Sequence, residues 1–374
     1  MTVRAALVKI HLWLALISAT FLVILGLTGA IIAFENDIDH WLNPSLFYVH
    51  SSGQALSESE LIRIVDRAYA PARVAFVHIF RQPNLVQIMQ LTDRSTVLIN
   101  PFDGRILGRI VGPSTVQKMV GSLHQIHTHL VPDPRSTPRL ARIGGIIVQV
   151  AGWILCLLVP IGVILWWRAK RLVINWEASW FRVCFDAHQA IGIYAALFLM
   201  IAATTGVMVE RGDLISWFTQ SPGPSRFPTL KSSLLAGDPS VSVDRAEEIA
   251  RSVIPATNVT DIQIPRTPMD VYVVVLRVPE ETSEAAHSYV FIDQHSGQVL
   301  HTLNFLTDSR LYRLVRFNRS IHTGDVWGTP GHILMSLSSL VLVLMIVTGL
   351  VIWRRRSSLP VFNAVLPQST DASE

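Results

Sequence analysis

Four long apolar segments constrain the fold of this chain more than any other feature. They cover residues 11–34, 143–167, 187–209 and 333–353, and none contains Asp, Glu, Lys or Arg. A helix needs about 20 apolar residues to cross a bilayer, so each segment is long enough. Only 16% of the residues are charged and the mean hydropathy is +0.40, which is too apolar for an ordinary soluble protein. The sequence therefore predicts a membrane protein with four transmembrane helices.

Basic residues close to the spans predict the orientation. They form three groups: Arg4 and Lys9, then Arg168, Lys170, Arg171 and Arg182, and finally Arg354, Arg355 and Arg356. If all four spans cross the membrane, these groups fall on one side, which the positive-inside rule assigns to the cytoplasm. We expect the loop 168–186, the tail 354–374 and both termini there, and residues 35–142 and 210–332 on the other side. The net charge of +4 largely reflects these flanks, so no nucleic-acid partner is expected.

Each outer segment is predicted to begin with a helix and to continue with short strands. Capping-box spacing marks the helix starts at Ser57 with Glu60, and at Asp244 with Glu247. Alternating or β-branched runs then predict strands, at 72–81, 85–91 and 95–100 in the first segment and at 258–264, 271–278 and 287–293 in the second. A turn and a further short strand follow in both, at 105–107 and 298–300.

The two halves of the chain share one plan of span, helix-plus-strand module and span. His11 lies 17 residues before Thr28, and His188 lies 17 residues before Thr205; a Gly follows each Thr. A parallel tandem repeat has its pseudo-two-fold axis along the membrane normal. Two duplicated helix pairs can form a four-helix bundle with a cofactor in its core. We therefore predict a membrane α+β protein with four transmembrane helices in a parallel tandem repeat and two outer modules.

Four histidines occupy equivalent places in the two halves. His11 and His188 lie at the cytoplasmic ends of the first and third spans, and His127 and His322 each lie in an Ile-His-Thr triplet on the outer side. A haem iron on the repeat axis takes one imidazole from each face, which a pair of equivalent residues supplies. We predict two b-type haems per chain with bis-histidine ligation, one by His11 and His188 and one by His127 and His322.

Other ligand assignments stay open on the outer side. His332 lies at the start of the fourth span, at the edge of an apolar helix, and is a further candidate haem ligand in place of His127 or His322. His124 is another. The cluster His124-x-x-His127-x-His129 also fits a zinc or copper site, since imidazoles at i and i+3 share one face of a helix.

Missing motifs narrow the source of electrons. The sequence has no Gly-x-Gly-x-x-Gly or Walker loop, so no nicotinamide, flavin or nucleotide site is predicted. The cytoplasmic loop and tail are too short to fold a donor domain. We therefore expect electrons from membrane quinol or from a cytoplasmic flavoprotein.

A set of motifs carries a family resemblance over nearly the whole chain. They are His-x-x-x-(Ala/Gly) at His11 and His188, the Thr-Gly pairs at 28–29, 205–206 and 348–349, the two outer modules, and Ile-His-Thr-Gly-Asp-Val-Trp-Gly at 321–328. The chain resembles the PepSY-associated transmembrane family of bacterial inner-membrane proteins. Within that family it is most similar to the ferric-siderophore reductases of the ferrioxamine type, which are di-haem proteins. The resemblance implies PepSY-like modules in the periplasm.

These expectations point to an oxidoreductase. Electrons would enter on the cytoplasmic side and reduce a ferric siderophore in the periplasm, which releases Fe(II) for iron uptake because hard oxygen chelators bind Fe(II) less tightly. One alternative is a non-enzymatic protein whose modules bind peptides or regulate a periplasmic protease, since short exposed strands suit strand addition. Another is a transporter, although no span contains an Asp, Glu, Lys or Arg that would couple ions.

Overall fold

The computed structural model describes residues 2–50, 53–80, 84–168, 170–210, 228–233, 241–278, 287–307, 313–314 and 317–357, together with residue 310. Most of the stretch that joins the third span to the second outer module lies outside these ranges. So does the end of the predicted cytoplasmic tail, 358–374.

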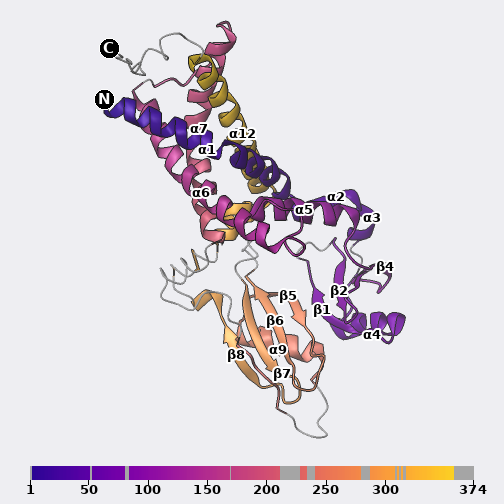
Figure 1. Ribbon diagram of the computed structural model, residues 1–374. Helices are drawn as coiled ribbons and strands as arrows, with labels where there is room; N and C mark the ends of the chain where they lie inside the picture. Colours follow the sequence, from indigo (N-terminus) through magenta and orange to yellow (C-terminus); the bar gives the residue numbers. More distant parts are fainter. Residues whose placement is uncertain are drawn as a thin grey trace, which may run out of the picture.

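Four long helices form one bundle (Figure 1). They are α1 (Val3–Ile32), α6 (Pro138–Trp167), α7 (Trp180–Glu210) and α12 (Thr329–Ser357). All four are long and apolar enough to cross a membrane, so the chain is a membrane protein. Helix α1 packs against α6 and α12, and α7 packs against the same two helices. As a result α1 and α7 face each other across the bundle axis.

The helices are longer than the apolar segments that predicted them. Helix α1 begins at Val3, where the Thr2 hydroxyl accepts a hydrogen bond from the Ala5 N–H. Hydropathy marks only the apolar part of a helix, whereas the backbone hydrogen bonds continue into polar flanks. His11 and His188 therefore lie inside α1 and α7, each eight residues after the first residue of its helix.

The strands of both outer segments form one antiparallel sheet in the order β4-β3-β2-β1-β5-β6-β7-β8. The first set is β1 (Val74–His78), β2 (Gln87–Leu91), β3 (Thr96–Ile99) and β4 (Ile106–Ile110). The second set is β5 (Asn258–Gln263), β6 (Val271–Arg277), β7 (Ser288–Asp293) and β8 (Val299–Leu303). All eight predicted strands are present. The sequence predicted two separate modules, but β1 pairs with β5 and joins them.

The junction between the two sets is a regular antiparallel pairing. Phe76 lies opposite Gln263, Val77 opposite Ile262 and His78 opposite Asp261. The His78 Nδ1 atom lies 2.6 Å from an Asp261 carboxylate oxygen. Side-chain alternation predicts a strand but does not name its partner, which is why the sequence pattern did not reveal this pairing.

One face of the joined sheet packs on two helices, α4 (Glu58–Tyr69) and α9 (Val243–Val253). Leu61 and Val65 of α4 and Ala246 and Ala250 of α9 are fully buried in a single apolar core. The same core contains strand residues from both sets. Burial of this continuous apolar surface stabilises the two sets as one body.

The capping prediction was correct for α4 and wrong for α9. The Ser57 hydroxyl accepts from the Glu60 N–H and the Glu60 carboxylate accepts from the Ser57 N–H. In α9 the cap is Ser242, not Asp244. Asp244 instead accepts a hydrogen bond of 3.0 Å from the Ser59 N–H at the start of α4. Asp244, which the local spacing assigned to the cap of α9, therefore bonds to α4 instead.

Shorter helices fill the space between sheet and bundle. They are α2 (Glu35–Leu42), α3 (Pro44–Phe47), α5 (Thr115–His129), α11 (Asn318–Thr323) and the 3₁₀ turns Phe305–Thr307 and Asp325–Trp327. Helix α5 packs on α1 and α6, and α11 packs on α7. Figure 1 shows α5 at the end of the bundle that faces the sheet. We call this the sheet end, and the opposite end, where α1 begins, the far end.

Glu58 makes the stability of the outer part depend on pH. Burial raises the pKa of its carboxyl from 4.5 to about 7, and the nearby Glu247 and Asp244 add to the rise. As the pH increases from about 4.5 to 7, the unfolded state loses a proton that the folded state keeps, so stability falls. Glu58→Gln should therefore raise the melting temperature at pH 8 by a few degrees, with little effect near pH 4. Glu248→Gln, which changes an exposed side chain, should raise it at neither pH in thermal unfolding followed by circular dichroism.

Candidate functional site

Two of the predicted histidines line one cavity at the far end of the bundle. His11 of α1 and His188 of α7 both line it, and its volume is about 380 Å³, within the range of small-molecule and cofactor sites. Its walls come from all four long helices and are mainly apolar. Arg4 and Lys9, in the first turns of α1, are among its few charged residues. The cavity combines two imidazoles, an apolar wall and positive charge near one end.

The other two predicted histidines meet at the sheet end. His127 comes from α5 and His322 from α11, the short helices that pack on the outside of the bundle. Their ring centres are 6.4 Å apart and their planes are inclined by 51°. With metal–nitrogen bonds of about 2 Å, two imidazoles on opposite sides of one metal ion have ring centres roughly 6 Å apart. The pair therefore has the spacing of two ligands that share one ion.

The Thr-Gly pairs are the contact points of the histidines. Their Nδ1 atoms lie 2.9–3.0 Å from threonine hydroxyl oxygens in the pairs His127–Thr28, His188–Thr348 and His322–Thr205. The glycine that follows each threonine makes room for the ring. A Cβ atom added at Gly29, Gly349 or Gly206 would lie 3.1, 3.4 or 2.9 Å from the Cε1 atom of the same histidine. In the sequence these pairs marked only the repeat, because nothing near a Thr-Gly pair identifies the distant histidine that contacts it.

The hydroxyl contacts determine which ring nitrogen is available. Thr28, Thr205 and Thr348 each donate their single hydroxyl proton to a main-chain carbonyl four residues earlier, over 2.6–2.8 Å. The oxygen must then accept from histidine, so Nδ1 carries the proton and Nε2 keeps its lone pair. Metal-binding histidines are commonly held in this way, with the second ring nitrogen donating to the protein.

His11 is the exception among the four. Gly162 of α6 is its glycine, and an added Cβ there would lie 3.5 Å from the His11 Cε1 atom. The position before this glycine is Ile161, where the other three sites have threonine. The His11 Nδ1 atom consequently lacks a threonine partner and is buried without a side-chain hydrogen bond; the Leu158 carbonyl lies near this ring.

Burial keeps His127 and His322, the pair at the sheet end, uncharged. It lowers the pKa of His127 to about 3 and that of His322 to about 4. The proximity of the two rings lowers the value for His127 further. At neutral pH both imidazoles are therefore neutral, which is the form that binds a metal ion.

His332 is held by two carboxylates in the structure. Its Nδ1 atom lies 3.0 Å from an Asp37 oxygen and its Nε2 atom 2.8 Å from an Asp325 oxygen. Asp325 also accepts a hydrogen bond of 2.6 Å from Thr323, the neighbour of His322. Because both ring nitrogens are engaged, the geometry favours His127 and His322 over His332 as a ligand pair. The cluster instead ties α12 to α2 and to the loop after His322.

The three histidines of the predicted zinc or copper cluster have different partners. His124 lies 2.8 Å from the Glu35 carboxylate, His127 contacts Thr28, and the His129 ring contacts the Thr128 hydroxyl. Among the described residues, no group of three or more His, Cys, Asp or Glu side chains is placed to hold a metal ion. Helix α5 therefore presents one imidazole to His322 and not a three-ligand site.

Comparison with known proteins adds one finding. The family model of the PepSY-associated TM region matches residues 8–356, nearly the whole chain. A search of curated proteins gives no match.

Thr205 and its neighbour allow a direct test of the histidine contact. Thr205→Val removes the acceptor of the His322 N–H and leaves a buried donor unpaired, which costs about 1–3 kcal/mol. The melting temperature of the purified protein in detergent should fall accordingly. Thr204→Val is the matched control, because the Thr204 side chain is exposed and its hydroxyl bonds only to its own helix. Equal melting temperatures for the two variants would contradict the assigned contact.

The carboxylate cluster around His332 makes a second prediction. His332→Leu leaves Asp37 and Asp325 facing each other without the histidine, and the unpaired charges should cost about 1–3 kcal/mol. Adding Asp325→Asn to this variant removes one charge and should restore part of the loss. Thermal unfolding of the single and double variants measures both effects. A double variant no more stable than His332→Leu would mean that charge is not the cause.

Proposed function

The chain belongs to the PepSY-associated TM family, and we propose that it is a di-haem b-type reductase of the bacterial inner membrane. In this proposal it passes electrons from the cytoplasmic side or the quinol pool to a ferric siderophore in the periplasm. Reduction releases Fe(II) for iron uptake.

The observation that carries the proposal is the pairing of four part-buried histidines, three of them with Nδ1 fixed by a threonine. His11 and His188 would hold one haem in the far-end cavity, and His127 and His322 would hold the second at the sheet end. Bound haem supplies one-electron chemistry at a potential that its axial ligands help to set. A mere membrane anchor gives no reason for four such contacts.

The remaining residues of the two sites fit the same group. The glycines opposite the imidazoles leave space beside each ring, and the apolar walls keep water away. Arg4 and Lys9 at the far-end cavity can pair with the carboxylates that haem carries. The His11 Nδ1 atom has no threonine partner, so His11 is the least constrained of the four ligands.

The tandem repeat and the orientation are part of the proposal. His11 faces Gly162 and His188 faces Gly349, while His127 faces Gly29 and His322 faces Gly206, so each contact lies within one half and has a counterpart in the other. A pseudo-two-fold axis along the membrane normal relates such halves. With the basic flanks in the cytoplasm, the termini lie there and the sheet lies in the periplasm.

The electron balance requires an external donor. Each ferric ion takes up one electron and becomes ferrous. A quinol that gives up two electrons and two protons therefore reduces two chelates, whereas a cytoplasmic flavoprotein can deliver electrons singly. The substrate enters and leaves on the sheet side, because the iron is needed in the periplasm for uptake.

A second candidate is a non-enzymatic PepSY protein that binds peptides or regulates a periplasmic protease. It is favoured by the sheet, which ends in β4 on one side and β8 on the other. Neither strand has a further strand beside it among the described residues. A strand edge of this kind can accept an extended peptide. This candidate needs no haem, so a spectrum separates it from the first.

The test is the reduced-minus-oxidised visible spectrum of the purified protein, with haem counted per chain. We expect two low-spin b haems. His11→Ala should remove one and His322→Ala the other, while His301→Ala, an exposed side chain on β8, should keep both. A colourless wild-type protein, made with adequate haem supply, would overturn the proposal in favour of the peptide-binding candidate.

A further inference from the structure

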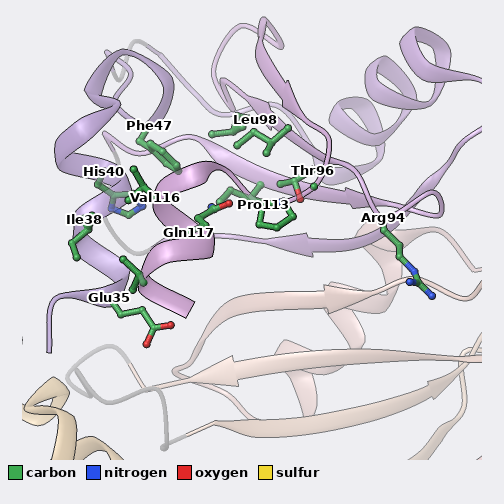
Figure 2. Close-up of a pocket in the computed structure, with 14 residues that line it drawn as sticks. Glu35, Ile38, His40, Phe47, Arg94, Thr96, Leu98, Pro113, Val116 and Gln117 are labelled. Atoms are coloured by element: carbon green, nitrogen blue, oxygen red, sulfur yellow. The ribbon is translucent and has the colours of Figure 1, made fainter. Parts of the chain in front are cut away.

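A second cavity lies outside the bundle, on the face of β2, β3 and β4 away from α4. It has a volume of about 480 Å³ and is lined by these strands and by α2, α3 and α5. Figure 2 shows Phe47, His40 and Val116 together on one side, with Thr96, Pro113 and Gln117 further along. We call this the sheet cleft. It takes no part in holding the four histidines.

The sheet cleft is mainly apolar with one charge of each sign. Its apolar lining includes Ile38, Phe47, Ile88, Leu98, Val116 and Val120. Glu35 and Arg94 also line it, and Figure 2 shows them at opposite ends of the row of side chains. Such a surface favours an uncharged ligand with an apolar shell, because the desolvation of several like charges would not be compensated.

Helix α5 links the sheet cleft to the outer histidine pair. Val116 and Val120 line the cleft, and His127 follows Val120 by seven residues, or two turns, on the same stripe of the helix. At 1.5 Å per residue, His127 is roughly 10 Å along the helix from Val120. Glu35 lines the cleft and also contacts His124 at 2.8 Å, and His124 acts electrostatically on His127.

We propose that the sheet cleft binds the electron acceptor, a ferric chelate with no net charge and a largely apolar organic shell. This inference rests on the proposed function and adds where the substrate binds and which charge it carries. A chelate bound here would lie beside α5, whose residue Val120 is roughly 10 Å along the helix from His127, a proposed haem ligand. The step is one-electron: Fe(III) becomes Fe(II), no bond to the protein forms, and the external donor supplies the electron.

The test measures binding without reduction. A gallium(III) tris-hydroxamate has the charge and shape of its ferric counterpart but is not reduced, so its dissociation constant can be measured by calorimetry whether or not haem is present. Val116→Trp should fill the cleft and weaken binding at least tenfold. Met119→Trp, three residues later with an exposed side chain, should bind as the wild type does. Ile38→Trp, on α2 instead of α5, repeats the test if Val116→Trp fails to fold.

A charge comparison completes the experiment. A gallium(III) tris-catecholate of similar size, which is strongly anionic, should bind at least tenfold more weakly than the tris-hydroxamate. Unchanged tris-hydroxamate binding by a folded Val116→Trp or Ile38→Trp variant, or no binding by the wild type, would overturn the cleft as the acceptor site. Haem loss with intact, Val116-dependent binding would instead support the cleft and overturn the reductase.

Discussion

The structure depends on one requirement, that a buried imidazole must find an acceptor for its N–H in an apolar bundle. Water cannot supply one there, and an unpaired donor costs free energy. A threonine hydroxyl that already donates to its own helix is an acceptor that also fixes the tautomer. The glycine beside it lets the ring come close. Together the Thr-Gly pair sets the position, the protonation and the free nitrogen of the histidine that contacts it.

This requirement explains why short helices accompany the long ones. His127 and His322 could not reach Thr28 and Thr205 from the sheet, so α5 and α11 hold them against α1 and α7. The His332 cluster then ties the loop after His322 to α2. The pair His127 and His322 is thus held by long helices, short helices and the His332 cluster, whereas His11 at the far end has no threonine partner.

Much of the fold and of the histidine site could be predicted from the sequence. The remainder depends on contacts between residues that are far apart in the chain. Apolar length predicted the four spans and alternation predicted the strands. Equal spacing to Thr-Gly singled out His11 and His188, and the shared Ile-His-Thr triplet singled out His127 and His322. Local patterns did not identify the β1–β5 pairing or the carboxylates around His332. They also did not show that Asp244 accepts a hydrogen bond from Ser59 instead of capping α9. In each of these cases the partner is far away in the chain, and nothing near the residue identifies it. Helix α5 was missed because its polar, histidine-rich sequence is only weakly amphipathic.

The shared sheet restricts how the two halves can exist. An isolated half would expose the β1 or β5 edge as a row of unpaired backbone groups and uncover the apolar core that α4 and α9 now close together. The strands of such a half would tend to aggregate unless a second half covered that edge. Fusion into one chain supplies the second half at high effective concentration. Separate halves would have to assemble as a dimer through this same seam.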